Sequence, residues 1–522
     1  MNSHTSEGPF LLGIDFGTES CRAAIFDIKG HPVTFAATPY KLSHPRAGWA
    51  EQDPEEWWTA LQTSTRKALQ TSGIPADAIK GISYDATTMT VVAMDKTGRS
   101  LRPAIMWMDV RATEQAARAS TIDHWARLYN GGGKAPATAE WYPFKVAWLR
   151  ENERETYDNA YRLVDAADWV TFKLTGEWTT NINSAALRMY YNRDHGGWPV
   201  EFYEHIGCGD VFDKIPERVV DLGTPISGLS ATAADALGLL PGTPVAQGPA
   251  DAWAGQIGLG VVRPGKMALI TGSSHVLTGQ SDVALNGEGF FGGYTDGVMP
   301  GQYTVEGGQV STGSVLKWFK DNFCKDLVTA AEASGGSPYE ILNEQSKDIP
   351  IGSDGLIVNE YWQGNRTPYT DSKARGTIWG LSLHHSREHL YHAIQEGVCM
   401  GTEHILRTMR TAGMSVDEIV ACGGGTKSMA WMQMHSDVTG VPITLTEVGD
   451  AVVLGSCMIA AVGAGIYKDL PEAADHMVHT VSTLEPDMAR HEEYKFYVDK
   501  YINTFPSLRE DMHEMVDHEA AR

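Results

Sequence analysis

Asp251 is the ionisable side chain of the stretch 247–255, near the middle of the 522-residue chain. Residues 245–246 are typical of the end of a buried strand, Pro249 suits the turn or first helical position that follows, and residues 252–254 indicate an apolar helix. The N-terminal end of a helix dipole would keep such a carboxylate ionised, as a general base requires. The same position is typical of a plain N-cap, so the residue by itself leaves both interpretations open.

Turns rich in glycine, serine and threonine follow three predicted strands. Glycine lets the backbone approach a phosphate closely, and free amide N–H groups donate hydrogen bonds without any net positive charge. One such turn would be weak evidence, but three of them around a strand-end aspartate suggest a nucleotide in a cleft between domains. The turns contain Gly17 and Thr18, then Thr271, Gly272 and Ser273, then Gly423, Gly424 and Gly425.

The elements that must position these residues alternate between strands and helices. In the first half, strands are predicted at 10–14 and 21–27, and a helix capped by Asp53 follows. In the second half, strands at 266–270 and 276–279 repeat the first hairpin in shape. The alternation favours an α/β fold, and the repeat suggests two halves built on one plan.

Three later segments carry further structural predictions. Residues 306–309 are expected between a strand and a helix that begins near Ser311. The uncharged apolar run 451–467 is short for a membrane span and rich in small residues, so we expect a buried helix packed closely on a sheet. The segment 471–522 is charged and rich in histidine, which indicates a helical tail.

Composition limits the class of protein. At 522 residues, we expect two large domains, with or without a small appendage. With 42% apolar and 20% charged residues the chain is not mainly disordered, and its net charge of −23 disfavours binding to nucleic acid or to an anionic membrane. An anionic ligand would therefore have to be bound by amide groups, a metal ion and a few cationic side chains.

The six cysteines are widely spaced and form no Cys-x-x-Cys pair, which favours reduced thiols in the cytoplasm over a zinc site or a disulfide framework. The first nine residues contain no basic segment followed by an apolar one, so no signal peptide is predicted.

Six motifs resemble, in order and spacing, those of the FGGY carbohydrate kinase family, over a stretch from about Leu11 to Tyr467. The resemblance implies two ribonuclease-H-like domains of the actin and hexokinase type, with ATP and a sugar in the central cleft. It places a domain on the sugar and phosphate side at 8–255, one on the nucleotide side at 256–470, and the charged tail at 471–522. The motifs are Asp15-Phe16-Gly17-Thr18, Trp107-Met108-Asp109-Val110-Arg111, Gly248-Pro249-Ala250-Asp251-Ala252, Thr271-Gly272-Ser273, Glu306-Gly307-Gly308-Gln309 and Gly423-Gly424-Gly425-Thr426-Lys427-Ser428.

The resemblance also assigns roles to residues. It makes Asp251 the general base that takes the proton of the attacking sugar hydroxyl, and it makes Asp15 a holder of Mg²⁺ through water. Residues expected to contact phosphates or to line the nucleotide are Gly17, Thr18, Thr271, Gly272, Ser273, Gly313, Gly424, Gly425 and Ser428.

Within the family, the chain is most similar to the ribulokinase branch, because Ala252 follows the aspartate and a Glu-Gly-Gly-Gln segment begins at Glu306. Glu306, Thr88 and Arg188 would then contact the sugar. The L-ribulose enzymes have lysine where Arg188 aligns, and the segment 85–87 resembles the D-ribulose enzymes although Thr88 and the residue after it do not. The implied substrate is a ketopentose such as ribulose. A kinase for a four- or five-carbon polyol or other sugar, and a non-catalytic actin-like regulator that binds sugar and nucleotide, are the alternatives; a homodimer is left open.

Several other residues that could bind a ligand or a metal also have interpretations as packed, paired or solvated side chains. Asp109 and Arg111 could form an internal ion pair or contact the sugar, and Trp107 is better interpreted as a core residue than as a stacking platform. Arg188 would be a surface residue if the alignment were misplaced. We expect the histidines to form a solvated or packed face, because no third metal ligand accompanies them. These histidines are His384, His385, His389 and His392.

Overall fold

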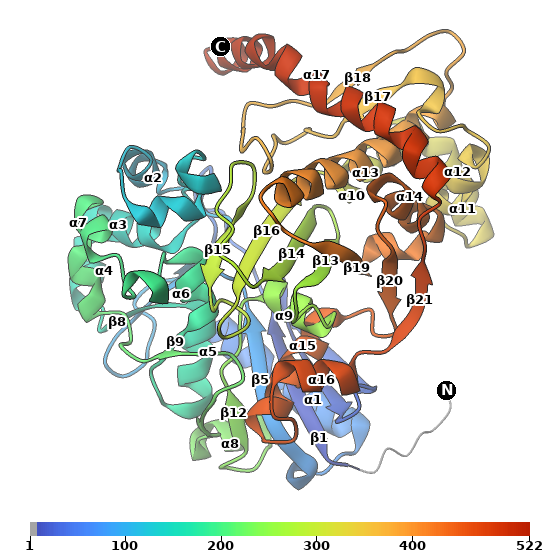
Figure 1. The fold of residues 1–522 in the computed structure, drawn as a ribbon. Helices are drawn as coiled ribbons and strands as arrows, with labels where there is room; N and C mark the ends of the chain where they lie inside the picture. The colour runs from blue at the N-terminus through green and yellow to red at the C-terminus, as the bar shows by residue number, and fades with distance from the viewer. Residues whose placement is uncertain (1–7) are drawn as a thin grey trace.

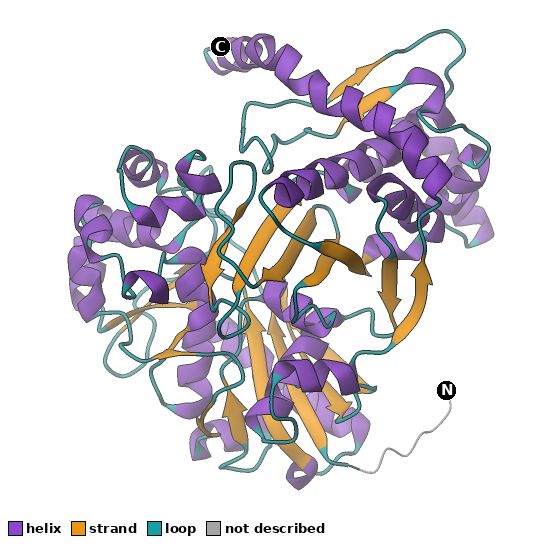
Figure 2. Ribbon diagram, in the orientation of Figure 1, coloured by secondary structure: helices purple, strands orange, loops and turns teal. Residues whose placement is uncertain are grey.

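The computed structural model describes residues 8–522; residues 1–7, part of the stretch predicted to lack a signal peptide, lie outside the described residues. The chain forms two α/β units, built around a six-stranded and a seven-stranded sheet whose faces are covered by helices (Figures 1 and 2). All six cysteines are buried free thiols, as predicted.

The first sheet has the order β11-β12-β5-β1-β2-β3. An antiparallel meander of β1, β2 and β3 is extended by β5 and β12, which run parallel to β1. Every residue of β1 is buried, as expected for a central strand covered on both faces. The strands are β1 (Phe10–Phe16), β2 (Ser20–Asp27), β3 (Pro32–Pro39), β5 (Ile79–Ala86), β11 (Pro225–Gly228) and β12 (Pro244–Ala246).

The second sheet repeats this plan with the order β15-β16-β14-β13-β19-β20-β21. Its hairpin β13–β14 corresponds to β1–β2, and β19 runs parallel to β13 as β5 does to β1. The predicted repeat of the hairpin is therefore confirmed. The strands are β13 (Gly265–Thr271), β14 (His275–Ser281), β15 (Phe291–Thr295), β16 (Tyr303–Gln309), β19 (Val416–Gly423), β20 (Ile443–Thr446) and β21 (Thr480–Leu484).

Helices of the first unit begin and end at residues that local rules favour, and α1 and α5 pack on its six-stranded sheet. The carboxylate of Asp53 caps α1 by accepting the N–H of Glu55 at 3.0 Å, and α5 ends at Gly176 in the left-handed conformation. These helices are α1 (Pro54–Ser72), α2 (Thr113–Ala119), α3 (Tyr142–Asn152), α4 (Arg154–Asn159), α5 (Ala166–Thr175), α6 (Ile182–Arg188), α7 (Val200–His205) and α8 (Ala231–Leu237). Short strands accompany them: β4 (Glu51–Gln52), β6 (Val91–Met94), β7 (Ala104–Ile105), β8 (Arg162–Asp165), β9 (Thr180–Asn181) and β10 (Val219–Val220).

Helices of the second unit cover the second sheet, with the long helices α13 and α17 packed against one another (Figure 1). They are α10 (Gly313–Phe323), α11 (Lys325–Ser334), α12 (Pro338–Ser346), α13 (Arg387–Thr411), α14 (Met429–Thr439) and α17 (Met488–Ala520), together with a small hairpin of β17 (Ile357–Asn359) and β18 (Thr377–Trp379).

Two helices, α9 (Asp251–Gly258) and α15 (Ala451–Gly463), cross with their backbones in contact. A Cβ atom on Gly258 would lie 1.8 Å from the carbonyl oxygen of Ala451, and one on Gly455 would lie 1.9 Å from that of Ala254. In addition, α15 packs on β1 and β5 of the first sheet, so the predicted buried helix on a sheet is confirmed (Figure 1). Among the described helices, none has the length and apolarity needed to cross a bilayer.

Two predictions about elements were wrong. Glu306 and Gln309 lie within strand β16, because the segment pairs with β14 along its length, and α10 begins later, at Gly313. The segment after residue 470 is not only helical: α16 (Leu470–Met477) and α17 are joined by β21, which pairs with β20. Residues of α17 also enter the core of the second unit, namely Tyr494, Val498, Tyr501 and Phe505.

Gly455→Ala tests the backbone contact. Alanine is the better helix former, but its methyl group must displace the carbonyl of Ala254, so we expect the free energy of unfolding to fall by about 1–3 kcal/mol. Urea denaturation measures the change, and Gly336→Ala, in an exposed loop, is the control that should change little. A neutral effect of Gly455→Ala would show that the helices can separate without cost.

Candidate active site

A cavity of about 620 Å³ is lined by residues from both halves of the chain. Its walls include the strand ends of the first sheet, the start of α9 and the strand β16. Six residues that the sequence predicted for a site lie together in these walls: Asp15, Gly17, Thr88, Arg188, Asp251 and Glu306.

Asp251 is the first residue of α9, after Ala250 at the N-cap position. Its Oδ1 accepts the N–H of Ala252 at 2.7 Å, so the carboxylate interacts with its own helix end without acting as the N-cap. Burial, and then the negative charge of Asp15, raise the pKa of Asp251 to about 7. The expectation that the helix dipole keeps this group fully ionised is therefore wrong; Asp251 can gain or lose a proton near neutral pH.

Arg22 connects Asp15 to the second half of the chain. It lies opposite Asp15 in the β1–β2 register, and its Nε donates to Oδ2 of Asp15 at 2.7 Å. Its Nη1 donates to Oδ2 of Asp450, the residue before α15, at 2.7 Å. Sequence reasoning did not single out Arg22, although the hairpin register would have placed it beside Asp15.

A third carboxylate, Asp85, lies near the end of the neighbouring strand β5, in register with Asp15. Its Oδ2 accepts a hydrogen bond from Ser456 at 2.7 Å, whereas its Oδ1 is buried without a partner among the described residues. Burial, and then the charge of Asp15, raise its pKa well above the ordinary value. The site therefore has more carboxylates than nearby cations, and an unpaired carboxylate oxygen, so this donor set fits a hard divalent cation such as Mg²⁺.

Arg188 and Glu306 form a buried ion pair on another wall. Nη2 of Arg188 lies 2.7 and 2.8 Å from the two carboxylate oxygens of Glu306, and its Nη1 donates to the hydroxyl of Tyr294 at 3.2 Å. The guanidinium also lies 4.8 Å from the ring centre of Trp253. Arg188 is thus not a surface residue.

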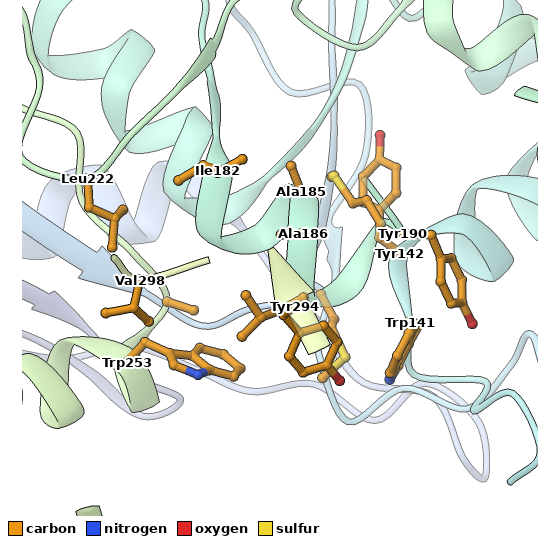
Figure 3. Close-up of a cluster of buried hydrophobic side chains, with 14 of the residues drawn as sticks. Trp141, Tyr142, Ile182, Ala185, Ala186, Tyr190, Leu222, Trp253, Tyr294 and Val298 are labelled. Carbon is orange, nitrogen blue, oxygen red and sulfur yellow. The ribbon is translucent and has the colours of Figure 1, made fainter. Parts of the chain in front are cut away.

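Arg188 lies against a cluster of buried aromatic and small apolar side chains, which Figure 3 shows. Trp253 projects from α9 and Tyr294 from β15, while Ala185 and Ala186 bring α6 close to them. The arginine at the end of α6 is therefore held in a packed, low-dielectric wall, where its bond to Glu306 is stronger than it would be in water.

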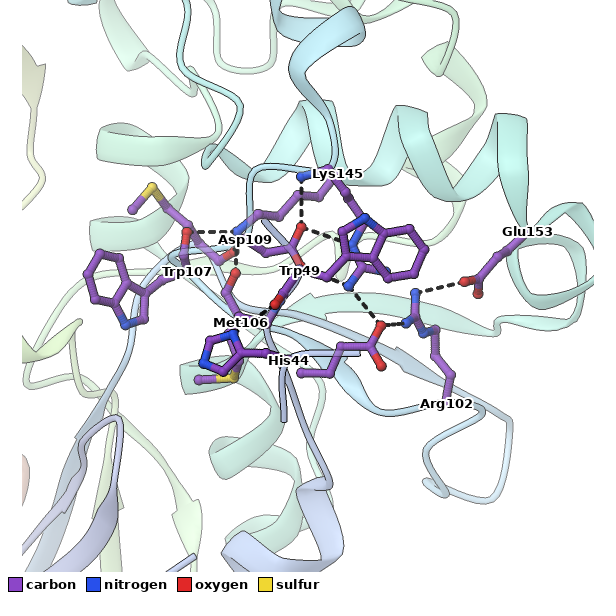
Figure 4. Close-up of polar contacts among 12 residues, drawn as sticks. His44, Trp49, Arg102, Met106, Trp107, Asp109, Lys145 and Glu153 are labelled. Carbon is purple, nitrogen blue, oxygen red and sulfur yellow. Dashed lines mark hydrogen bonds and ion pairs between the residues drawn. The ribbon is translucent and has the colours of Figure 1, made fainter. Parts of the chain in front are cut away.

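Lys145 holds a further wall in place (Figure 4). Its buried ammonium group donates to the carbonyl oxygens of Met89, Met106 and Trp107 at 3.0, 2.6 and 3.0 Å. Burial lowers its pKa to about 7. Met89 has a left-handed φ of 59°, and Thr88 beside it keeps a buried hydroxyl without a partner among the described residues. Lys145 thus shapes the loop that presents Thr88.

The Asp109–Arg111 alternative is settled in favour of an internal ion pair, since both side chains are fully buried and Nη2 lies 2.7 Å from Oδ2 (Figure 4). Arg111 is also held 3.7 Å from the ring centre of Trp49. Trp107 lines the cavity as well as packing on the core, and its Nε1 donates to Oγ1 of Thr18 at 3.0 Å.

The glycine turns of the second unit contact one another, outside the cavity walls named above. Thr271 accepts the N–H of Gly425 at 2.9 Å, and Ser273 accepts the N–H of Thr312 at 2.9 Å. A Cβ on Gly313 would lie 2.4 Å from the carbonyl of the residue before Ser273, so the start of α10 touches this turn. Gly272, Ser273 and Gly424 are exposed and lie beside a helix N-terminus, an arrangement that suits phosphate, although the N–H of Gly272 donates to the carbonyl of Ser274 at 2.9 Å. Ser428 is the N-cap of α14.

Comparisons with known proteins agree on both the family and the fold of this chain. The N-terminal domain of the FGGY family of carbohydrate kinases matches residues 10–258, and its C-terminal domain matches residues 267–464. An FGGY carbohydrate kinase domain-containing protein of Xenopus laevis is 32% identical, with 96% of each chain covered. A ribulokinase of Geobacillus thermodenitrificans is 32% identical over 90% of this chain and 89% of its own. The crystal structure of xylulose kinase from Rhodospirillum rubrum has a TM-score of 0.86 and 27% identity, over 97% of this chain and 100% of that one. The predicted two-domain fold is confirmed.

Lys145→Met tests the wall that Lys145 supports. Methionine fills a similar volume but leaves three buried carbonyl groups without their donor, so we expect a loss of about 1–3 kcal/mol in the free energy of unfolding. Urea denaturation gives the value, with Lys134→Met at an exposed position as the matched control. Equal stability of the two variants would mean that water replaces the ammonium group at no cost.

Proposed function

The chain belongs to the FGGY family of carbohydrate kinases, which are ATP-dependent sugar phosphotransferases, and we propose that its substrate is a ketopentose such as ribulose. Membership of an enzyme family argues against the non-catalytic regulator considered from the sequence. The observation that carries the proposal is the cavity in which Asp251 shares walls with the Arg188–Glu306 pair. A ribulokinase among the relatives supports the choice of a pentulose.

In this proposal Asp251 is the general base. Its pKa near 7 suits a group that must accept a proton from a sugar hydroxyl at neutral pH. A base of this kind contributes about 10²–10⁴-fold, and most of the remaining acceleration in phosphoryl transfer comes from positioning and charge neutralisation. Water exclusion by the two units around the cavity would limit wasteful hydrolysis of ATP.

Asp15 and Asp85 would hold Mg²⁺, with Asp15 acting through water. The ion would neutralise charge on the phosphates and on the transferring group. Arg22 would keep the carboxylate of Asp15 oriented and hold Asp450 of the second half beside it.

The exposed amides of the glycine turns would bind ATP. Since the protein carries a net charge of −23, these neutral donors and the N-terminus of α10 can hold phosphate without a large basic surface. The residues proposed for phosphate and nucleotide are Gly17, Thr18, Thr271, Gly272, Ser273, Gly313, Gly424, Gly425 and Ser428.

The sugar would lie against Glu306, Arg188 and Thr88. In the structure Glu306 uses both oxygens on Arg188, so a sugar hydroxyl would donate to their remaining lone pairs, and the guanidinium would fix the carboxylate. The free hydroxyl of Thr88 supplies a further hydrogen bond. Because the residue after Asp251 is only alanine, this side also has room for a four- or five-carbon polyol, which is the alternative substrate.

Asp251→Asn tests the base. Asparagine preserves shape but cannot accept the proton, so we expect kcat for sugar phosphorylation to fall by about 10²–10⁴-fold while ATP affinity stays within a few-fold. A coupled ADP-release assay gives kcat, and calorimetry gives the nucleotide Kd. Unchanged turnover would remove Asp251 from this role.

The pH profile is a second readout of the same residue. Because the carboxylate must be deprotonated to act, kcat/KM of the native enzyme should fall as pH drops below about 7, the value to which burial and Asp15 raise the pKa of Asp251. The residual kcat/KM of Asp251→Asn should not show this fall at low pH. If the fall persists in the variant, another titrating group causes it.

Glu306→Gln tests the sugar side and the substrate class together. The substitution removes the charge that holds Arg188, so we expect the sugar KM to rise by about tenfold or more with little change in the ATP KM. The assay is run over ketopentoses, tetruloses and polyols. Greater loss of ATP affinity than of sugar affinity would show that Glu306 is on the nucleotide side, and turnover of a polyol alone would favour the alternative substrate.

A further inference from the structure

Three metal-binding side chains meet on the surface of the second unit, outside the cavity. Oδ2 of Asp354 lies 3.3 Å from Nε2 of His384 and 3.3 Å from Nε2 of His389, and the three donor atoms all lie within 4.8 Å of one another. The sequence showed the histidines without a third ligand. Asp354, thirty residues earlier in the chain, supplies it.

We propose that Asp354, His384 and His389 form a Zn²⁺ site, with water completing the coordination. Two imidazole nitrogens and one carboxylate oxygen are donors that zinc accepts and that Mg²⁺ and Ca²⁺ do not prefer. The site is separate from the proposed reaction, since none of the three residues lines the cavity.

The distances fit two ligands of one metal ion, and one of them also fits a long hydrogen bond between Nε2 of His389 and Asp354. Ligand atoms about 2.0–2.1 Å from zinc at tetrahedral angles are about 3.3 Å apart, which matches both contacts of Asp354. An ordinary N–H···O hydrogen bond is shorter, about 2.9–3.0 Å.

The surrounding groups orient the ligands. Nδ1 of His389 lies 3.2 Å from the backbone N of Ser386 and 2.9 Å from its Oγ. Zinc at Nε2 would displace the proton of that nitrogen, and Nδ1 would then carry the ring proton and donate it to Oγ of Ser386. His385 is bonded differently, because its Nδ1 accepts the N–H of Ser382 at 2.8 Å and its Nε2 faces the backbone carbonyl of Asp354 at 3.2 Å. It therefore braces the turn and is not a ligand.

The turn that carries Asp354 is held rigidly against α13. Ser353 and Asp354 both have left-handed φ values, 48° and 55°, between two glycines in the same region. Buried Glu396 on α13 fixes this conformation, because it accepts the N–H of Gly352 at 2.8 Å and the hydroxyl of Ser353 at 2.7 Å. The carboxylate is thus positioned before an ion arrives, while exposed His384 leaves a path for the ion from solvent.

A bound ion would link the segment between β18 and α13 to the turn that carries Asp354. His384 belongs to that segment, His389 to the first turn of α13, and Asp354 to the turn before β17. The expected consequence is greater stability of the second unit, because an ion that binds the folded chain shifts the unfolding equilibrium towards it.

Equilibrium dialysis of the full-length, metal-free protein against Zn²⁺ tests the site. Excess Mg²⁺ is present throughout to occupy sites made of carboxylates alone. We expect the native chain to bind one Zn²⁺ more than each of His384→Gln, His389→Gln and Asp354→Asn, and zinc to raise the Tm of the native chain but not of these variants. His518→Gln, which removes an exposed histidine outside the cluster, should bind zinc as the native chain does.

The substitutions are chosen so that the variants fold. Glutamine at position 389 keeps the pattern of a capping box with Ser386, and asparagine tolerates the left-handed conformation at position 354. Circular dichroism and sugar phosphorylation should be unchanged in all of them. The proposal is overturned if the native chain binds no more zinc than the cluster variants, or if only the His518 variant loses zinc.

Discussion

The backbone contact between α9 and α15 determines where the charged groups of the cavity lie. With no side chain at Gly258 or Gly455, each helix packs directly on a backbone carbonyl of the other. Asp251 begins α9, and Asp450 immediately precedes α15. The crossing therefore brings the end of the second unit to the strand ends of the first, where Arg22 can reach both Asp15 and Asp450.

Electrostatics in the cavity follow from this arrangement. Burial, and after it the negative charge of Asp15, raise the pKa of both Asp85 and Asp251, since a low dielectric and nearby like charge oppose ionisation. Two nearby cationic side chains are held by other protein groups, because Arg188 pairs with Glu306 and Lys145 donates hydrogen bonds to carbonyl oxygens. In the proposed binding mode, the neutral donors of the glycine turns and a metal ion would therefore supply most of the contacts to phosphate.

The sequence predicted those features that arise from local patterns. The two hairpins, the cap at Asp53 and the small-residue helix α15 were visible because periodicity, capping residues and composition act over a few positions. The resemblance to a family added residues such as Arg188 and Glu306, which the structure places 2.7 Å apart although 118 positions separate them. Arg22, Lys145 and Asp354 were missed because their partners are brought near only by the fold. The protonation of Asp251 was misjudged for the same reason, because its burial and the neighbouring charge of Asp15 are both tertiary effects.

The order of the elements along the chain also affects how the protein folds during synthesis. The core of the first unit includes side chains from β15, α15 and α16, although most of that unit lies before residue 258. During synthesis, the first sheet must wait with an uncovered apolar face until the ribosome has passed Met477, and the second sheet lacks its edge strand β21 and the packing of α17 until later still. Such distant contacts slow folding and prolong exposure of apolar surface. Helices synthesised near the end of the chain thus complete the core of the first unit. A truncation between the two units would remove α15 and α16 and leave the first sheet exposed on the face that they cover.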